Sequence, residues 1–433
     1  MDKPNLQPAT FKFTGTSEML RVGLRPLALT LEQVLVLLAI TLLGIGLVMV
    51  QSAALRVGNL PHPWLLHFFV NPAGLHLFLA VGVMLVLARL DYRRLLGGKL
   101  THSAAAVLMV LAIGLLLLVF TPLGATINGA KRWLLVRVGT HALSFEPSEL
   151  AKWALVLFVA AYAVHRGEKI RRFFTGFLPV AGVIAVTCAL ILKEDFGTAA
   201  LLAGVSAMLL LMAGVRWWHL AILAPLVLVV GYFAVWQIPY RRERLLIFLH
   251  PNLDPRGAGY NPIQSLLSFA SGGWPGRGLG NGIQKMGYLP EANTDFIFSL
   301  IAEELGFFGC FLVVTLYMGL LVCGWRVFQR AGDLFGKLLA FGYTAMIGLQ
   351  AAMNIAVATV SVPTKGIALP LISDGGTGWA LTAGAVGLLI SLERQRRAGL
   401  AASAASGAES PQPIKLPVAV PGDQARQRIR PVA

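Results

Sequence analysis

The chain has 433 residues, of which 56% are hydrophobic and only 13% are charged. Soluble domains carry about 25% charged residues, so this composition excludes an ordinary soluble protein. The net charge of +16 would suit a nucleic-acid binder, but the basic residues lie between long apolar runs, so no nucleic-acid partner is predicted. The three cysteines lie in apolar stretches and form neither a disulfide framework nor a metal-ligand spacing.

The apolar runs predict transmembrane helices, because a helix of about twenty apolar residues spans a bilayer. We expect an all-α polytopic membrane protein with about ten spans. In chain order the expected spans are Leu31–Ala53, Val70–Ala88, Ala104–Phe120, Pro147–Val164, Gly176–Leu192, Gly197–Gly214, His219–Trp236, Phe296–Cys323, Leu334–Val360 and Ala368–Leu392. Residues 1–30 then form an N-terminal tail, residues 31–392 the transmembrane domain, and residues 393–433 a disordered C-terminal tail rich in Ala, Ser, Pro and Gln.

Lysines and arginines in the connections predict the orientation, because cytoplasmic loops carry an excess of both. With the N-terminus inside, roughly two thirds of these residues fall on the cytoplasmic side. We therefore predict a multi-pass protein of the cytoplasmic (inner) membrane with both termini in the cytoplasm. The basic residues left on the outer side fit either solvated loop charge or an anionic ligand at the outer face.

The fourth expected span contains an acid and a base, Glu149 and Lys152. Residues three apart share a helix face, and charges at membrane depth are costly enough to be functional candidates. The alternative is that the two side chains only neutralise each other.

The longest connection, residues 237–294, joins the seventh and eighth spans on the outer side. It begins with the basic cluster Arg241-Arg242-Glu243-Arg244 and becomes glycine-rich between Ser271 and Gly282. Long loops in compact proteins are usually functional or disordered, and the aromatic residues here argue against disorder. We expect this segment to dock on the lipids of the outer leaflet, with a structural re-entrant loop as the alternative.

The eighth expected span begins beside Asp295, which is either a catalytic acid or an acid that stabilises the first helical turn. Glu303 and Glu304 follow on the same helix, and we expect structural acids with hydrogen-bond partners rather than catalysts. The sequence has no H-E-x-x-H zinc signature, no Walker A motif and no Rossmann glycine pattern. Any reaction would therefore use acids, bases and cations at the outer face.

Several motifs, taken together and in order, are similar to those of one known family. They are Asn128-Gly129-Ala130-Lys131-Arg132-Trp133, Pro147-Ser148-Glu149-Leu150-Ala151-Lys152, Asp195-Phe196-Gly197-Thr198, Gln264-Ser265-Leu266, Leu289-Pro290-Glu291 with Thr294-Asp295-Phe296, Glu303-Glu304-Leu305-Gly306, and Pro370-Leu371-Ile372-Ser373 with Gly375-Gly376. The chain resembles the SEDS family (shape, elongation, division and sporulation) from the first span to Leu392. Thr364-Lys365-Gly366 is more similar to the division members than to the elongation members.

The resemblance implies a ten-helix peptidoglycan glycosyltransferase that polymerises lipid II into glycan strands at the outer face of the membrane. It implies a role at the division septum, with lipid II, the growing glycan strand, a class B penicillin-binding protein and other membrane proteins of the divisome as partners. Asp295 matches the family's catalytic acid, and Lys152 matches a lysine expected to face that acid in a central cavity.

The expected substrate contacts extend beyond these two residues. A base must act on the attacking hydroxyl group, which we assign to Asp295, and cations must stabilise the charge of the leaving diphosphate. The remaining substrate-binding candidates are Lys131, Arg132, Glu149, Arg241, Arg242 and Gln264. The alternatives left open are a lipid II flippase, a non-catalytic scaffold and an elongation-type polymerase.

The sequence departs from the family pattern at three places that each add an acid. Glu146 replaces a glutamine, Lys193-Glu194 replaces Gln-Pro, and Asp374 replaces a tyrosine. One hypothesis is an acidic outer cavity that uses a divalent cation, Mg²⁺ or Mn²⁺, to bind diphosphate; no other cofactor is assigned. The favoured alternative is lineage drift, with Lys193 paired to Glu194.

Overall fold

The computed structural model describes residues 29–54, 72–127, 130–138, 141–250, 254–374 and 376–406. The predicted N-terminal tail up to residue 28 and the predicted disordered tail from residue 407 onward lie outside the described residues. So do Asn128, Gly129 and Gly375 of the family motifs.

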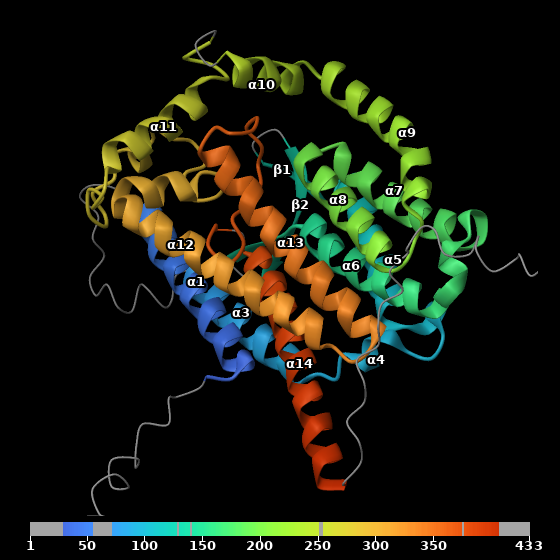
Figure 1. Cartoon of the computed structure of the whole chain (residues 1–433). Helices are drawn as coiled ribbons and strands as arrows, with labels where there is room; N and C mark the ends of the chain where they lie inside the picture. Colours follow the sequence, from blue (N-terminus) through green and yellow to red (C-terminus); the bar gives the residue numbers. More distant parts are fainter. Residues whose placement is uncertain are drawn as a thin grey trace, which may run out of the picture.

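Long apolar helices dominate the molecule (Figure 1). Six segments are long and apolar enough to cross a membrane, and they contain α1 (Leu31–Ala54), α6 (Pro147–Arg166), α7 (Leu178–Leu192), α9 (Trp217–Trp236), α12 (Ile297–Arg330) and α13 (Leu334–Ala358). Three shorter apolar helices are α3 (Pro72–Arg89), α5 (Ala104–Val119) and α8 (Phe196–Met212), and α14 (Thr377–Ser406) is the last helix. Each expected span corresponds to one of these helices, which confirms the polytopic helical fold.

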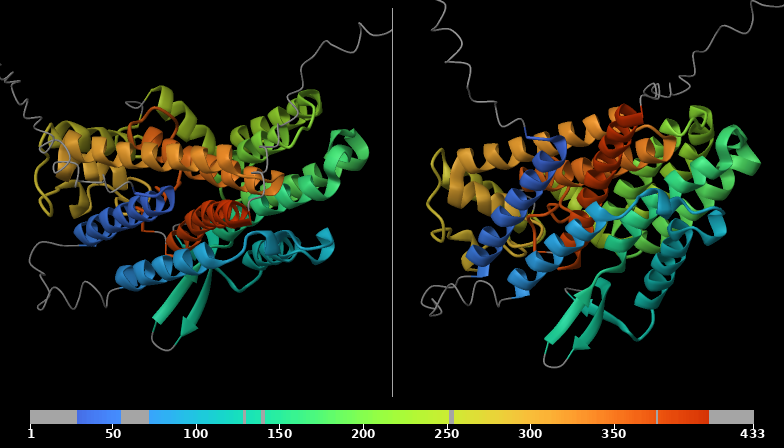
Figure 2. Two further views of the ribbon diagram at one scale, coloured as in Figure 1. Left: turned by 60° about the horizontal axis from the view of Figure 1, so that its bottom comes forward. Right: turned by 90° about the horizontal axis from the view of Figure 1, so that it is seen from below.

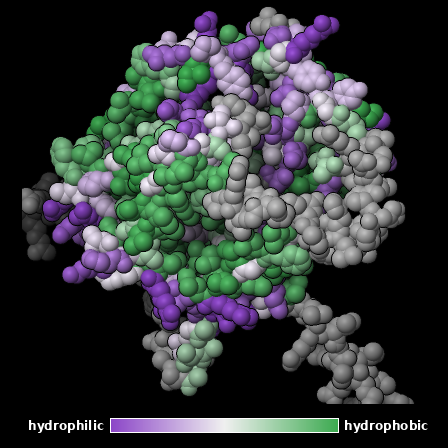
Figure 3. Space-filling model, turned by 180° about the vertical axis from the view of Figure 1, so that it is seen from behind, coloured by the Kyte–Doolittle hydropathy of each residue, from purple (hydrophilic) through white to green (hydrophobic). Residues whose placement is uncertain are grey.

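Packing among the helices is uneven. α6 is central, because most of its residues are buried, whereas α9 buries only His219 among its residues. Many large hydrophobic side chains elsewhere are exposed, including Phe78, Val110, Leu228 and Phe311. On the face shown in Figure 3 the hydrophobic surface is broad, and hydrophilic residues gather at its edges. This distribution fits a protein surrounded by lipid, since helices that are apolar on all sides occur in membranes or in large cores.

A three-stranded antiparallel sheet, which sequence analysis did not anticipate, joins α5 to α6. Its strands β1 (Gly124–Ile127), β2 (Ala130–Val138) and β3 (His141–Phe145) pair in the order β1-β2-β3, with Leu134 opposite both Gly124 and Phe145. The sheet projects from the helices in both views of Figure 2. The all-α description therefore holds for the spans but not for this connection.

The long outer segment contains two helices, α10 (Pro239–Leu249) and α11 (Tyr260–Gly272). In Figure 1, α9, α10 and α11 follow one another in an arch along one side of the molecule. The glycine-rich loop that follows α11 packs against a break in α12. At this break Gly306 has φ +65° and ψ −159°, and a Cβ atom there would lie 2.3 Å from the Gly276 nitrogen. Only glycine tolerates this conformation and this contact.

The last helix differs from its prediction at both ends. The expected span begins at Ala368, but α14 begins at Thr377 and continues to Ser406, past the predicted boundary at residue 392. The residues before it, Gly366–Asp374, have no regular helix or strand. This irregular segment contacts α1 closely, because a Cβ atom on Gly46 would lie 2.7 Å from the Leu371 carbonyl oxygen. Irregular backbone at membrane depth occurs where it is buried in protein or lines a cavity.

Candidate active site

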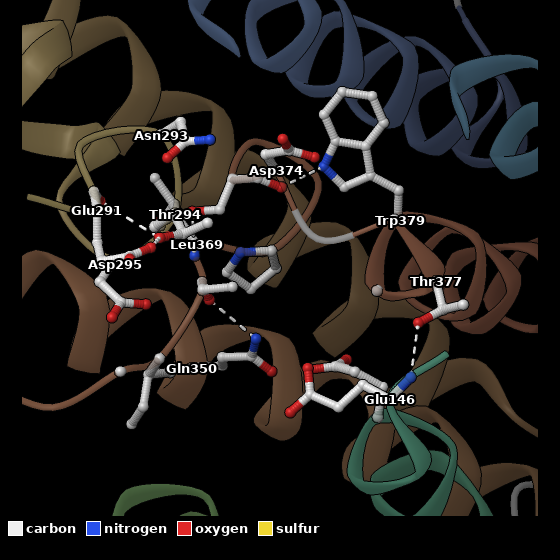
Figure 4. Close-up of a pocket in the computed structure, with 18 of the residues that line it drawn as sticks. Glu146, Glu291, Asn293, Thr294, Asp295, Gln350, Leu369, Asp374, Thr377 and Trp379 are labelled. Atoms are coloured by element: carbon white, nitrogen blue, oxygen red, sulfur yellow. Dashed lines mark hydrogen bonds between the residues drawn. The ribbon is translucent and has the colours of Figure 1, made fainter. Parts of the chain in front are cut away.

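One large cavity, with a volume of about 840 Å³, is lined in part by residues of the sheet. Its wall combines residues from α1, α3, β2, α6 and α13 with the turn before α12 and the irregular Gly366–Asp374 segment. The charged residues of the wall, with one histidine, are His76, Arg132, Glu146, Glu149, Lys152, Asp195, Arg244, Glu291, Asp295 and Asp374. Figure 4 shows Asp295, Gln350 and Glu146 directed toward this space from three different elements.

Asp295 lies in the turn before α12. Its N–H group donates to the Glu291 carbonyl oxygen (3.1 Å), and its own carbonyl oxygen accepts from Asn354 Nδ2 (2.9 Å). Burial and then the negative charge of Glu291 raise the pKa of Asp295 to about 7, although the guanidinium groups of Arg132 and Arg244 oppose the rise. A carboxyl group with a pKa near neutrality is suited to accept a proton from a substrate hydroxyl.

Arg132 reaches the cavity from β2. Its Nη2 atom donates to the Glu194 carbonyl oxygen (2.7 Å), and its Nη1 atom lies 3.6 Å from Asp195 Oδ2. A Cβ atom on Gly366 would lie 3.6 Å from Arg132 Nη1 and 3.0 Å from Asp295 Oδ2. The guanidinium group and the catalytic candidate therefore flank the same glycine, and a side chain there would crowd the Asp295 carboxyl group.

Arg244 is a second cation of the cavity wall and comes from α10. Its Nη1 atom donates to the Thr364 carbonyl oxygen (3.0 Å), and its guanidinium group lies 4.2 Å from the centre of the Tyr240 ring. These contacts fix the guanidinium group in a cavity shared with Asp295. Arg132 and Arg244 together supply positive charge suited to bind a phosphate group.

Lys152 belongs to a second polar group in the same cavity. Its side chain is only 2% exposed, and its Nζ atom donates to Glu149 Oε1 and Gln350 Oε1, both at 2.8 Å. Gln350 in turn donates from Nε2 to the Ala368 carbonyl oxygen (2.9 Å). Lys152 and Glu149 thus form the ion pair that the sequence allowed, and the pair also supports the irregular segment.

Comparison with known proteins agrees with these motifs. The family model for FtsW/RodA/SpoVE, described as "Cell cycle protein", matches residues 32–398. The chain belongs to the SEDS family. A "Probable peptidoglycan glycosyltransferase FtsW" of Geobacter metallireducens is 38% identical over 84% of this chain and 95% of its own length. The protein of the same name from Thioalkalivibrio sulfidiphilus is 38% identical over 85% of this chain and 91% of its own length.

Solved structures of SEDS proteins share the fold. One chain, from a study titled "Structural coordination of polymerization and crosslinking by a peptidoglycan synthase complex", matches with a TM-score of 0.66 and 33% identity. The match covers 84% of this chain and 97% of that one. The rod shape determining protein RodA of Thermus thermophilus matches with a TM-score of 0.58 and 28% identity, over 84% of this chain and 96% of its own.

Four of the predicted substrate-binding residues do not line the cavity of this SEDS chain. Lys131 donates from Nζ to the Thr121 carbonyl oxygen (2.8 Å), and Arg241 donates from Nη2 to the carbonyl oxygens of Leu192 (2.8 Å) and Lys193 (3.0 Å). The Arg242 guanidinium group lies 5.4 Å from the centre of the Trp236 ring. Gln264 lies in α11, outside the cavity wall. These four residues therefore lie outside the cavity wall, and their role in substrate binding stays a prediction.

Three residues that sequence analysis left out of the site do contribute to it. Gln350 and Asn354 are buried amides four residues apart on α13, and they hold Ala368 and Asp295 respectively. Their spacing in an otherwise apolar span was a usable signal, because polar residues at i and i+4 share a helix face. His76 on α3 lies within 3.6 Å of a Cβ atom built on Gly376, but a lone histidine in an apolar run gives no such signal.

The three acids that depart from the family pattern have different surroundings. Glu146 lines the cavity, and burial followed by the charge of Glu149 raises its pKa to about 7. Asp374 also lines the cavity, and its N–H group donates to the Asn293 carbonyl oxygen (3.0 Å). Glu194 instead accepts from the Lys131 N–H group (3.1 Å), while the Lys193 ammonium group lies 4.5 Å from the centre of the Phe120 ring. Two of the three departures therefore add acid to the cavity.

Within the described residues, no three side chains of His, Cys, Asp or Glu are grouped so that they could hold a metal ion. The divalent cation stays a prediction from the sequence, and no reaction step below uses it.

Proposed function

We propose that this SEDS chain is a peptidoglycan glycosyltransferase of the division type, which polymerises lipid II into glycan strands during septal wall synthesis. The observation that carries the proposal is a shielded carboxyl group, Asp295, that shares a cavity with Arg132 and Arg244. Relatives with 38% identity bear the name "Probable peptidoglycan glycosyltransferase FtsW", which supports the proposal.

The reaction joins two lipid-linked disaccharides. A sugar hydroxyl of the acceptor attacks the anomeric carbon of the donor, a new C–O bond forms, and the bond to undecaprenyl diphosphate breaks. Asp295 accepts the proton of the attacking hydroxyl, which its raised pKa favours. Arg132 and Arg244 stabilise the negative charge that develops on the diphosphate, because cations fixed in position need no reorganisation when that charge forms. Lys152, held by Glu149 and Gln350, keeps the cavity wall in place and adds positive charge next to it.

The proposal includes a location and partners. The multi-pass helical fold places the chain in a membrane, and we propose the inner membrane at the division septum, with both termini in the cytoplasm and the cavity outside. We further propose that the chain works with a class B penicillin-binding protein, a transpeptidase, among other divisome proteins. This is supported by its similarity to a chain of a solved peptidoglycan synthase complex.

Replacement of the proposed base tests the function. Asp295→Asn keeps the size of the side chain but removes its ability to accept a proton, so we expect polymerisation of purified lipid II to fall by at least about a hundredfold. The measurement is polymer yield from the full-length protein in detergent, with its melting temperature as the folding control. Near-normal yield from a folded Asp295→Asn variant would contradict the assignment. Movement of labelled lipid II across vesicles without polymer would support the flippase alternative instead.

A further inference from the structure

The two acids of α12, Glu303 and Glu304, lie outside the active-site cavity and are completely buried. Each binds the glycine-rich loop that follows α11. Glu303 accepts from the N–H groups of Ile283 (2.8 Å) and Gln284 (3.1 Å to Oε2). Glu304 accepts from the N–H groups of Gly280 (3.1 Å) and Gly282 (3.3 Å). The expectation of structural acids with hydrogen-bond partners is thereby confirmed.

Glu304 also forms an ion pair in which neither side chain is exposed to solvent. Lys285 Nζ lies 2.7 Å from Glu304 Oε1, and both side chains are 0% exposed. Ser52 of α1 donates to Glu304 Oε2 (2.7 Å) and accepts from Lys285 Nζ (2.9 Å). The pair thus ties the loop to α1 and α12 together. Removal of one partner from such a pair leaves an uncompensated buried charge, which is strongly destabilising.

The backbone of the broken helix adds to this attachment. Arg277 and Gly278 donate their N–H groups to the carbonyl oxygens of Glu303 (3.0 Å) and Glu304 (2.9 Å). These carbonyls are free to accept because the positive φ of Gly306 interrupts α12 directly after them. The side chains and the backbone of Glu303 and Glu304 therefore both bind the glycine-rich loop. We call this set of contacts the Glu303–Glu304 clamp.

The segment from Gln284 to Glu303 forms a closed loop, because the clamp joins its two ends. Asp295 lies within this loop. At the start of the loop, the Gln284 carbonyl oxygen accepts from the Leu289 N–H group (2.8 Å). Further along the loop, Leu289, Ala292 and Phe296 are buried together against Val357. The turn around Asp295 is thus followed by α12 and preceded by the segment at Ile283 and Gln284, which the clamp holds against α12. Because the clamp joins Gln284 to Glu303, the segment that carries the turn is fixed at both ends.

A direct chemical role for Glu304 is poorly compatible with its contacts. Its two oxygens are occupied by an ammonium group, a hydroxyl group and two backbone N–H groups, and no solvent reaches it. We propose that Lys285 and Glu304 are positioning residues for the reaction, which hold the Asp295 turn in its active geometry from outside the cavity. This rests on the proposed function, because the geometry matters only if Asp295 is the base.

The test begins with Lys285→Met in the full-length protein, which leaves the Glu304 carboxylate unpaired. We expect kcat for lipid II polymerisation to fall by about tenfold to a hundredfold, because small misplacements of a catalytic group have effects of this size. We expect KM to change by less than about threefold, since the substrate contacts remain. Arg256→Met is the matched control, because it removes a cation from an exposed position in the same outer segment but outside the clamp, and it should behave as wild type.

The double variant Lys285→Met with Glu304→Gln separates positioning from loss of folding. Glutamine at 304 keeps the size of the side chain and one acceptor oxygen, which serves the N–H group of either Gly280 or Gly282. It no longer buries a charge, so the clamp can close without the ion pair. We expect this variant to recover wild-type melting temperature and at least about a third of wild-type kcat. A double variant that folds with a closed clamp but stays inactive would overturn the proposal, as would wild-type kcat for Lys285→Met alone.

Hydrogen–deuterium exchange gives a readout that does not depend on activity. In Lys285→Met we expect faster exchange at residues 287–296, and unchanged exchange in α8, which does not contact the clamp. If the wild-type protein fails to polymerise lipid II, the proposed function fails, but this exchange pattern still decides whether the clamp holds the Asp295 turn. Equal exchange at residues 287–296 in variant and wild type would overturn the proposal.

Discussion

At the scale of single residues, Asp295 stands between opposing charges. Glu291, four residues earlier, disfavours ionisation of its carboxyl group, whereas Arg132 and Arg244 favour it. Because burial disfavours ionisation most, the pKa of the Asp295 carboxyl group is raised to about 7. The site is therefore sensitive to pH over the physiological range.

This balance predicts the pH profile of the reaction. A base acts in its deprotonated form, so kcat should rise as the pH increases through about 7 and level off above about 8. Glu291→Gln removes a negative charge that raises the pKa of Asp295, so the rising limb should move to lower pH. Glu243→Gln is the matched control, because Glu243 is exposed on α10 and carries the same charge. A limb that stays in place in Glu291→Gln would show that Glu291 does not act on the base.

The sequence predicted part of this site. Asp295, Lys152, Glu149 and Arg132 were all named from motifs, and all line the cavity. Lys131 was named together with its neighbour Arg132, but successive side chains of a strand point to opposite faces. Lys131 accordingly turns to Thr121, and only Arg132 faces Asp195. Without knowledge of the strand, the sequence could not separate the two.

At the scale of elements, hydropathy located the helices well because apolar length alone defines a membrane span. Hydropathy gave wrong helix bounds where the chain forms no regular helix or strand. The last expected span began too early because the residues around Leu369–Ile372 are apolar, yet they form the cavity wall and are held by side chains of other elements. The Tyr317 hydroxyl group of α12, for example, donates to the Pro370 carbonyl oxygen. Such tertiary bonds leave no periodic trace in the sequence.

The break in α12 gives a prediction at this scale. Gly306→Ala places a methyl group at a positive φ and against the Gly276 nitrogen, so we expect a loss of about 1–3 kcal/mol of stability. The melting temperature in detergent should fall by several degrees, and polymerisation should fall with it because the Glu303–Glu304 clamp sits at the break. Gly319→Ala is the control in the same helix, because its Cβ atom would meet only Leu38 side-chain atoms, at 3.4 Å. Equal stability of Gly306→Ala and wild type would show that α12 tolerates a side chain at the break.

At the scale of the whole molecule, the orientation remains a prediction that the fold makes testable. The connections at the cavity end include α10, and those at the opposite end include the turn after α6. Glu243 and Lys169 are exposed at these two ends. With a cysteine at either position, an impermeant maleimide applied to intact cells should label residue 243 but not residue 169. The unsubstituted protein, whose described cysteines are half-buried or buried, gives the background. Labelling of residue 169 alone would reverse the assigned topology.

The ties between the Asp295 turn and later parts of the chain have a consequence for biosynthesis. The turn is held by Asn354 of α13 and by Ser373, and Gly366 lies against its carboxyl group. A growing polypeptide whose synthesis has only reached α12 already contains Asp295 but none of these three residues. The reactive centre is therefore assembled only when the C-terminal part has been translated and inserted. Unfinished chains in the membrane would remain inert, and wall synthesis would begin only with a completed protein.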